Sequence, residues 1–138
     1  MTPSDHVGRQ GPVKIPEDDE KRVRGLCLGL PEVTVRSDES RVRVRSTAHA
    51  FDIRRRPFCL LVAVADPAGN PAPLLVLRAD GGEREALLSI GHPFFAPRGG
   101  RDRVGVWLSD QTDWQEIREL VIESYCTLAP KKLIALLG

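Results

Sequence analysis

Apolar residues near the start of the chain recur with the period of an α-helix. Pro16 is followed by four acidic residues, a pattern typical of a first helical turn, where proline is tolerated and carboxylates are favourable. The apolar positions that follow are spaced i, i+3, i+4 and i+7, so one face of the segment is hydrophobic. The spacing predicts a helix over residues 16–30, with an apolar stripe made by Val23, Leu26, Cys27 and Leu30.

The middle of the chain shows the patterns of β-strands. From Arg41 to Arg45 arginine alternates with valine, which predicts an antiparallel strand with the valines facing the core and the arginines facing water. The continuous apolar run from Phe58 to Ala65 has the length of a central strand. Similar patterns predict strands at 49–53, 74–77 and 104–108, with a loop at 66–71.

Two further helices are indicated in the second half of the chain. Gly81 and Gly82 precede a short helix over residues 83–89. Asp113, with Glu116 three residues later, has the form of a capping box and predicts the start of a longer helix that Pro130 ends. The buried face of that helix is predicted to hold Trp114, Ile117, Val121, Ser124, Tyr125 and Leu128, and a short final helix to span residues 131–137.

The order of these elements predicts an α+β domain with two layers, one antiparallel sheet with helices packed on one face. The chain has 138 residues, which fits one domain. Residues 1–15 lack apolar periodicity, so they are expected to be disordered or loosely attached, and residues 16–138 to form the domain. No apolar run has the length of a membrane span or a signal peptide, which favours a soluble, cytoplasmic protein.

Several motifs of the C-terminal half occur together. They are His92-Pro93-Phe94-Phe95, Arg103-Val104-Gly105-Val106-Trp107-Leu108, Asp113-Trp114, Ser124-Tyr125 and Ala129-Pro130-Lys131-Lys132-Leu133. This string resembles the YjbR-like (MmcQ/YjbR) family of small bacterial α+β proteins, and the resemblance covers roughly residues 22–135. It implies a two-layer domain similar to secretion chaperones. The chain departs from the family pattern in the middle, where Arg54-Arg55-Arg56-Pro57 looks like an insertion or a bulge.

Charge is unevenly distributed, although the formal net charge is only +1. Six arginines and one aspartate stand between residues 41 and 56. Alternate residues on one face of a strand are about 6.6 Å apart, close to the roughly 6.8 Å between second-neighbour phosphates of one DNA strand. The candidate nucleic-acid-binding residues are Arg41, Arg43, Arg45, Arg54, Arg55, Arg56, Arg101 and Arg103. The alternative interpretation is that these arginines only solvate an exposed sheet face or protect its edge.

Two other features bear on a nucleic-acid partner. The loop from Arg98 to Arg103 contains two glycines, which let backbone N–H groups approach an anion, but it lacks the ending of a nucleotide P-loop. Trp107 lies between Val106 and Leu108, so if those two face the core it is expected on the solvent face among the arginines. The family resemblance implies a similar partner, because YjbR-like folds have been described as having a double-wing shape suggestive of DNA binding.

The sequence offers no catalytic set, metal site or cofactor motif. Its three histidines are far apart and lack metal-ligand spacing, and no serine stands in a nucleophile-elbow context. Its three cysteines form no Cys-x-x-Cys and are expected to be small buried hydrophobes. We therefore expect a non-enzymatic protein that binds nucleic acid weakly and without sequence preference. The alternative is a protein-interaction or chaperone-like module that uses the exposed sheet or the aromatic loop at 92–97.

Overall fold

The computed structural model describes residues 14–38, 48–66 and 68–137 and shows one six-stranded antiparallel sheet with the strand order β1-β2-β3-β4-β6-β5. Its elements are α2 (Glu17–Leu28), β1 (Thr34–Asp38), β2 (Ala48–Ile53), β3 (Arg56–Ala65), β4 (Pro71–Arg78), α3 (Gly81–Ile90), β5 (Phe94–Phe95), β6 (Arg103–Trp107), α4 (Trp114–Leu128), α5 (Lys131–Ile134) and a 3-10 turn, η1 (Ala135–Leu137).

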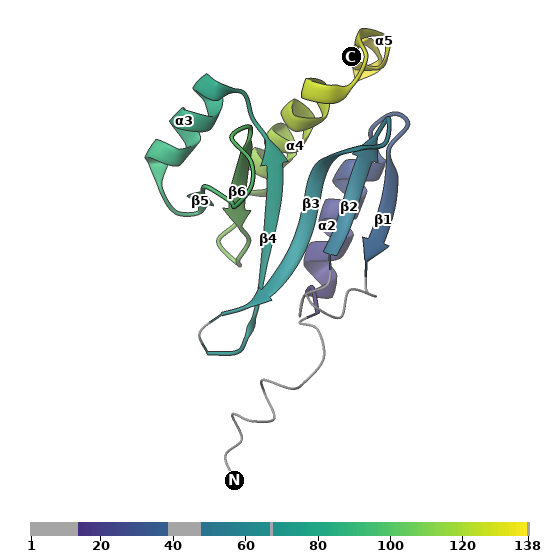
Figure 1. Ribbon diagram of the computed structural model, residues 1–138. Coiled ribbons are helices and arrows are strands. Elements are labelled where there is room, and N and C mark those ends of the chain that lie inside the picture. Colours follow the sequence, from purple (N-terminus) through teal and green to yellow (C-terminus); the bar gives the residue numbers. More distant parts are fainter. Residues whose placement is uncertain (1–13, 39–47, 67, 138) are drawn as a thin grey trace.

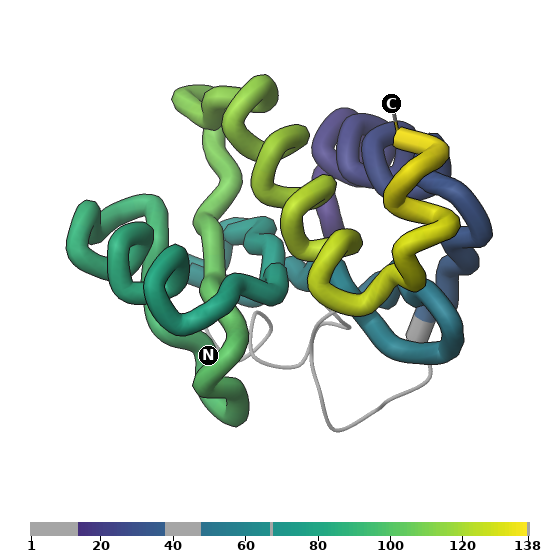
Figure 2. Tube along the Cα trace, turned by 90° about the horizontal axis from the view of Figure 1, so that it is seen from above, coloured from purple at the N-terminus to yellow at the C-terminus, as the bar shows by residue number. Residues whose placement is uncertain are grey.

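The sheet and its helices form two layers. Figures 1 and 2 show α2 and α4 behind the sheet, with α3 beside β5 and β6 at the far edge. The predicted fold class, a two-layer α+β domain with one antiparallel sheet, is confirmed. Among the described helices, none has both the length and the hydropathy of a membrane span.

Aspartate side chains cap the starts of two helices, α3 and α4. The Asp80 carboxylate accepts a hydrogen bond from the Glu83 N–H at 2.9 Å and caps α3. The Asp113 carboxylate accepts from the N–H groups of Gln115 and Glu116 and caps α4, which confirms the predicted helix start. These bonds satisfy backbone donors that have no partner within the helix.

The core lies between the helices and one face of the sheet. Tyr125 of α4 is fully buried, its ring meets Phe58 edge-on at 5.5 Å, and its hydroxyl donates to the Pro31 carbonyl at 2.8 Å. Cys27 and Cys59 are free and buried in the same core, whereas Cys126 is partly exposed. Ile15 is also buried in the core, so the domain begins at least one residue before the predicted boundary at residue 16.

Three local features differ from the sequence-based expectation. The strand β1 at Thr34–Asp38 was not predicted, whereas the strand predicted at Arg41–Arg45 falls outside the described residues. The helix α3 starts at Gly81 rather than at residue 83, since the cap is Asp80. The predicted aromatic loop at 92–97 contains the short strand β5, which extends the sheet by one strand.

Candidate anion-binding site at one end of the sheet

The predicted site residues meet at one end of the sheet, as far as the structure describes them. In an antiparallel sheet the start of β3, the end of β4 and the start of β6 share one end. The first residues of β3 and β6 are both arginines, and a turn and a loop carry others beside them. The described members are Arg54 and Arg55 in the β2–β3 turn, Arg56 at the start of β3, Arg101 in the loop before β6, and Arg103 at the start of β6.

A further arginine stands at the centre of this group. Arg78 ends β4 and is the direct cross-strand partner of Arg103. Burial lowers the pKa of Arg78, and the positive charge of Arg103, with a smaller contribution from Arg56, lowers it further, while Asp102 opposes this. Like charges are therefore held close together here, an arrangement that a bound anion would relieve.

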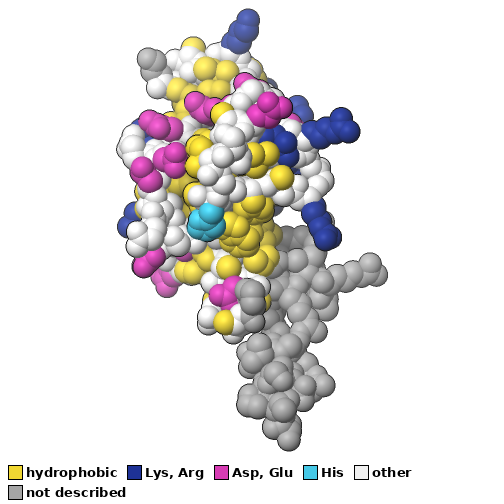
Figure 3. Space-filling view, turned by 90° about the vertical axis from the view of Figure 1, so that its left-hand side faces the viewer, with side chains coloured by type: hydrophobic (Ala, Val, Ile, Leu, Met, Phe, Trp, Pro, Cys, Tyr) yellow, Lys and Arg dark blue, Asp and Glu magenta, His cyan; other side chains and the backbone are white. Residues whose placement is uncertain are grey.

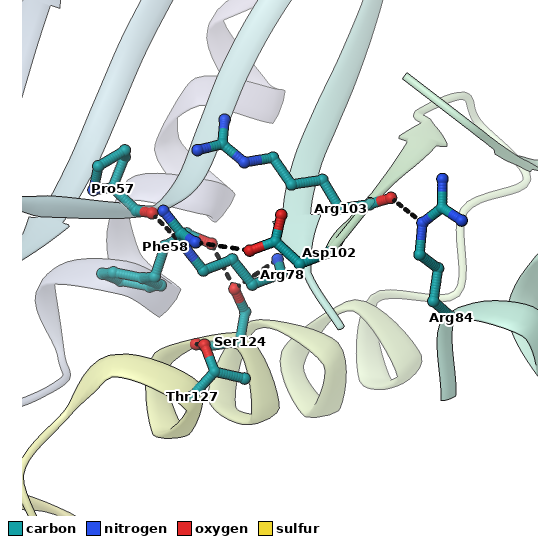
Figure 4. A network of polar contacts seen from close by, with 8 residues as sticks. All are labelled: Pro57, Phe58, Arg78, Arg84, Asp102, Arg103, Ser124 and Thr127. Carbon is teal, nitrogen blue, oxygen red and sulfur yellow. Dashed lines mark hydrogen bonds and ion pairs between the residues drawn. The ribbon is translucent and has the colours of Figure 1, made fainter. Parts of the chain in front are cut away.

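Arg78 is fixed by the protein itself. Its Nε donates to the Pro57 carbonyl at 2.8 Å, its Nη1 donates to Asp102 at 2.9 Å, and its side chain is only 11% exposed (Figure 4). The guanidinium thus joins β3 to the loop before β6. We interpret Arg78 as the fixed centre that places the outer arginines, since two of its N–H groups are bonded within the protein.

Arg103 is positioned from two sides. Its carbonyl accepts a hydrogen bond from Nε of Arg84 on α3 at 2.8 Å (Figure 4). Its side-chain stem lies against Gly100, because a Cβ at Gly100 would stand 2.9 Å from both Cγ and Cδ of Arg103. Among the described residues neither Arg103 nor Arg56 has a carboxylate partner for its guanidinium. Both guanidinium groups can therefore meet an anion.

The turn between β2 and β3 places two arginines in an unfavourable backbone conformation. Arg54 and Arg55 have φ values of 52° and 69°, the left-handed pair that a tight hairpin turn requires and that Asn-Gly fills best. Arg54 pairs with Glu32 at 3.1 Å, whereas Arg55 is exposed and has no ion pair with a described residue. Beyond this turn the register of β2 and β3 shifts by one residue between Phe51 and Asp52, which leaves Phe58 of β3 without a cross-strand partner.

The sheet face opposite α2 and α4 is largely apolar where it is described. One row of cross-strand partners runs Arg36, Ala50, Leu60, Val76, Gly105 and Phe95, and the next runs Asp38, Ala48, Val62, Leu74 and Trp107. Most of these apolar side chains are partly exposed, and no described helix covers them. We call this surface the outer face. The expectation of a polar outward face does not hold for β3 and β4.

Two aromatic rings lie on the outer face, one on β5 and one on β6. Trp107 is on this face, as the alternation along β6 predicted, and stacks on Phe95 with ring centroids 5.0 Å apart. The Phe95 ring lies directly over Gly105, since a side chain there would overlap it. Figure 3, viewed from the edge that carries α3, β5 and β6, shows hydrophobic side chains reaching the surface, with basic side chains along one side. In the aromatic loop at 92–97, Phe94 instead points into the core.

A hydrogen-bonded chain of Ser37, His49 and Glu20 also emerges from the fold. The Ser37 hydroxyl and His49 Nδ1 are 2.7 Å apart, and His49 Nε2 lies 3.1 Å from a Glu20 carboxylate oxygen. The order resembles a catalytic triad, but the same bonds join β1 and β2 to α2 and satisfy both nitrogens of a histidine that is 5% exposed. Sequence reasoning did not find this chain, since its members are distant in sequence.

Sequence reasoning also missed Arg78 and Arg84. The signal for Arg78 was its place directly after the apolar run Leu74–Leu77, at the end of a strand. Because β4 pairs with both β3 and β6, that strand end lies at the same end of the sheet as Arg56 and Arg103. No comparable signal marks Arg84, whose role depends on how α3 packs beside β6. Comparison with protein-family models, curated proteins and solved structures finds no match to this chain.

Proposed function

We propose that this protein is a non-enzymatic nucleic-acid-binding domain that contacts phosphates through the arginines at one end of its sheet. The observation that carries the proposal is the convergence of Arg56, Arg78 and Arg103 from three strands, with the guanidinium groups of the first and last lacking carboxylate partners among the described residues. A formal net charge of +1 makes this a local site rather than a general attraction, so binding should be weak. Phosphate contacts alone carry no sequence preference.

The family and location remain part of the same proposal. The resemblance to YjbR-like proteins supports a small bacterial domain with a DNA-related role, and the free buried cysteines Cys27 and Cys59 suit the reducing cytoplasm. We interpret the Ser37, His49 and Glu20 chain as structural. A serine-directed fluorophosphonate probe should therefore leave the native protein unlabelled, and labelling that disappears in Ser37→Ala would contradict the non-enzymatic proposal.

The test is fluorescence anisotropy with a labelled DNA duplex at about 50 mM salt and upward. If three to five arginines each meet a phosphate, log K should fall with log salt with a slope of roughly −3 to −4.5. Arg56→Gln combined with Arg103→Gln should reduce the steepness of that slope by about 2. The charge-matched control, Lys21→Gln with Arg118→Gln on the helical layer, should leave the slope unchanged. Equal slopes for both doubles, or absence of binding to both a duplex and a single strand of the same length, would overturn the proposal.

Arg41, Arg43 and Arg45 are proposed as further phosphate contacts, although they lie outside the described residues. Replacing all three with alanine should reduce the steepness of the salt slope by up to about 3 without changing the preference between sequences. An unchanged slope would remove them from the site and leave the arginines at the sheet end as its members.

The second candidate is a protein-interaction module. It is favoured by the outer face, where Leu60, Val62 and Val76 stand partly exposed side by side on neighbouring strands. A protein partner on this face would bind with little dependence on salt, which distinguishes it from phosphate binding.

A further inference from the structure

The geometry points to single-stranded nucleic acid, rather than duplex, as the ligand of this site. The inference rests on the proposed function and extends it by adding the aromatic pair Phe95 and Trp107 to the arginines. A duplex shows phosphates to a protein but hides the faces of its bases, whereas a single strand presents both. The outer face offers partners for both.

Arg103 and the two rings share one face of the paired strands β5 and β6. Arg103, Gly105 and Trp107 are alternate residues of β6, so the side chains of Arg103 and Trp107 point the same way, and the Phe95 ring fills the place that Gly105 leaves open. From Arg103 to Trp107 the strand extends roughly 13 Å. One bound strand of about 4 to 16 nucleotides, the usual length for such sites, can reach both ends.

The glycine explains why the rings are available to a ligand. With no side chain at position 105, the Phe95 ring lies against the sheet and stacks on Trp107 at an interplanar angle of 27°. Both rings are partly exposed rather than absorbed into the core. Flat rings of this kind stack on any base, which suits a site whose arginines do not select sequence.

The surface next to the rings suits bases as well. Leu74 and Val76 are the cross-strand partners of Trp107 and Gly105, and Val62 and Leu60 continue the same rows. A duplex contacts proteins mainly through phosphates and groove edges, so it would leave these exposed apolar side chains without a partner. Beside unpaired bases, these side chains continue the stacking surface.

The test compares three probes of equal length: a thymidine oligomer of 12 nucleotides, an abasic strand with the same phosphates, and a duplex. Because each stacked base contributes a factor of about 5 to 150, we expect the thymidine oligomer to bind at least about fivefold more tightly than the abasic strand. In a Trp114→Phe background Trp107 is the remaining tryptophan, and the oligomer should quench its fluorescence while the abasic strand should not.

Three variants separate stacking from charge. Phe95→Leu should reduce affinity for the thymidine oligomer by about fivefold or more and leave affinity for the abasic strand unchanged. Gly105→Ala should have the same effect by displacing the ring without removing it. The Arg56→Gln and Arg103→Gln double should weaken all three probes. Equal affinity for the oligomer and the abasic strand, without quenching, would overturn this inference and leave the proposed function standing. Failure of every probe to bind would overturn both.

Discussion

Ser124 shows how one small polar side chain holds two strands to a helix. Its hydroxyl donates to the carbonyl of Phe58 and accepts from the backbone N–H of Arg78 at 2.8 Å (Figure 4). The register shift in β3 leaves the Phe58 carbonyl in need of a partner, and Ser124 of α4 supplies it. The same bond fixes the end of β4, from which Arg78 extends.

Removing this hydroxyl should therefore cost far more than one ordinary hydrogen bond. Ser124→Ala would leave a buried donor and a buried acceptor unpaired, and we expect a loss of about 2 to 4 kcal/mol in the free energy of unfolding. Thr127→Ala, one turn along the same helix on an exposed side chain, is the matched control and should change it by no more than about 0.5 kcal/mol. Urea titration measures both. If both variants lose a similarly small free energy of unfolding, the Ser124 hydroxyl does not hold the two strands to the helix.

At the scale of elements, the β2–β3 turn has arginines at two positions where other residues would make the protein more stable. Arg54 and Arg55 both occupy the left-handed region, where a side chain with a Cβ costs roughly 1 to 2 kcal/mol and Asn or Gly costs less. A turn evolved only for stability would use those residues. The arginines place two charges directly before Arg56, which is consistent with a functional reason for the strain.

Replacing this turn should raise stability and lower binding together. Arg54→Asn with Arg55→Gly should increase the free energy of unfolding by about 1 kcal/mol, since the relief of strain exceeds the loss of the exposed Arg54 and Glu32 pair. The same variant should bind phosphate-containing probes more weakly, with a salt slope less steep by about 1 to 2. Urea titration and anisotropy on one preparation test both parts. A destabilised variant, or one with unchanged binding, would contradict the prediction that stability rises while binding weakens.

The cap of α4 and the central strand could be predicted from sequence because each depends on local chemistry. Asp113 and Pro130 bracket α4 closely, and the continuous apolar run at 58–65 became the long strand β3 in the middle of the sheet. The strand β1 could not be found this way. It is five residues long and mostly polar, and it exists because it pairs with β2 along its length.

At the scale of the whole molecule, the apolar outer face and the place of Arg78 among the predicted arginines escaped prediction for a common reason. An apolar run such as Phe58–Ala65 is typical of a strand buried on both faces, so its outward residues gave no sign that described helices cover one face only. Arg78 looked like an ordinary strand end until the register placed it opposite Arg103. Both features depend on long-range pairing, which composition and periodicity do not contain.

The whole protein should also lose stability as the pH rises toward neutrality. Contact with Glu123 raises the pKa of Glu83 from its ordinary 4.5 to about 7, with burial and the charge of Glu123 adding to the effect. Burial, with the charge of Asp18, raises the pKa of Asp19 as well. A carboxyl group with a raised pKa in the folded state binds its proton more tightly there than in the unfolded chain. Its stabilising contribution is present in full below pH 4.5 and is lost as the pH passes about 7.

Glu83→Gln isolates this effect, because glutamine keeps the shape of the side chain and cannot ionise. At pH 4.5 we expect the variant and the wild type to unfold at similar urea concentrations, and at pH 8 we expect the variant to be the more stable of the two, since it no longer holds a carboxylate against Glu123. Glu119→Gln, an exposed carboxylate on the same helix as Glu123, is the control and should keep the wild-type dependence on pH. If the stability of Glu83→Gln and of the wild type changes with pH in the same way, Glu83 of α3 and Glu123 of α4 do not repel each other. A variant that loses stability more steeply than the wild type as the pH rises would contradict the predicted direction.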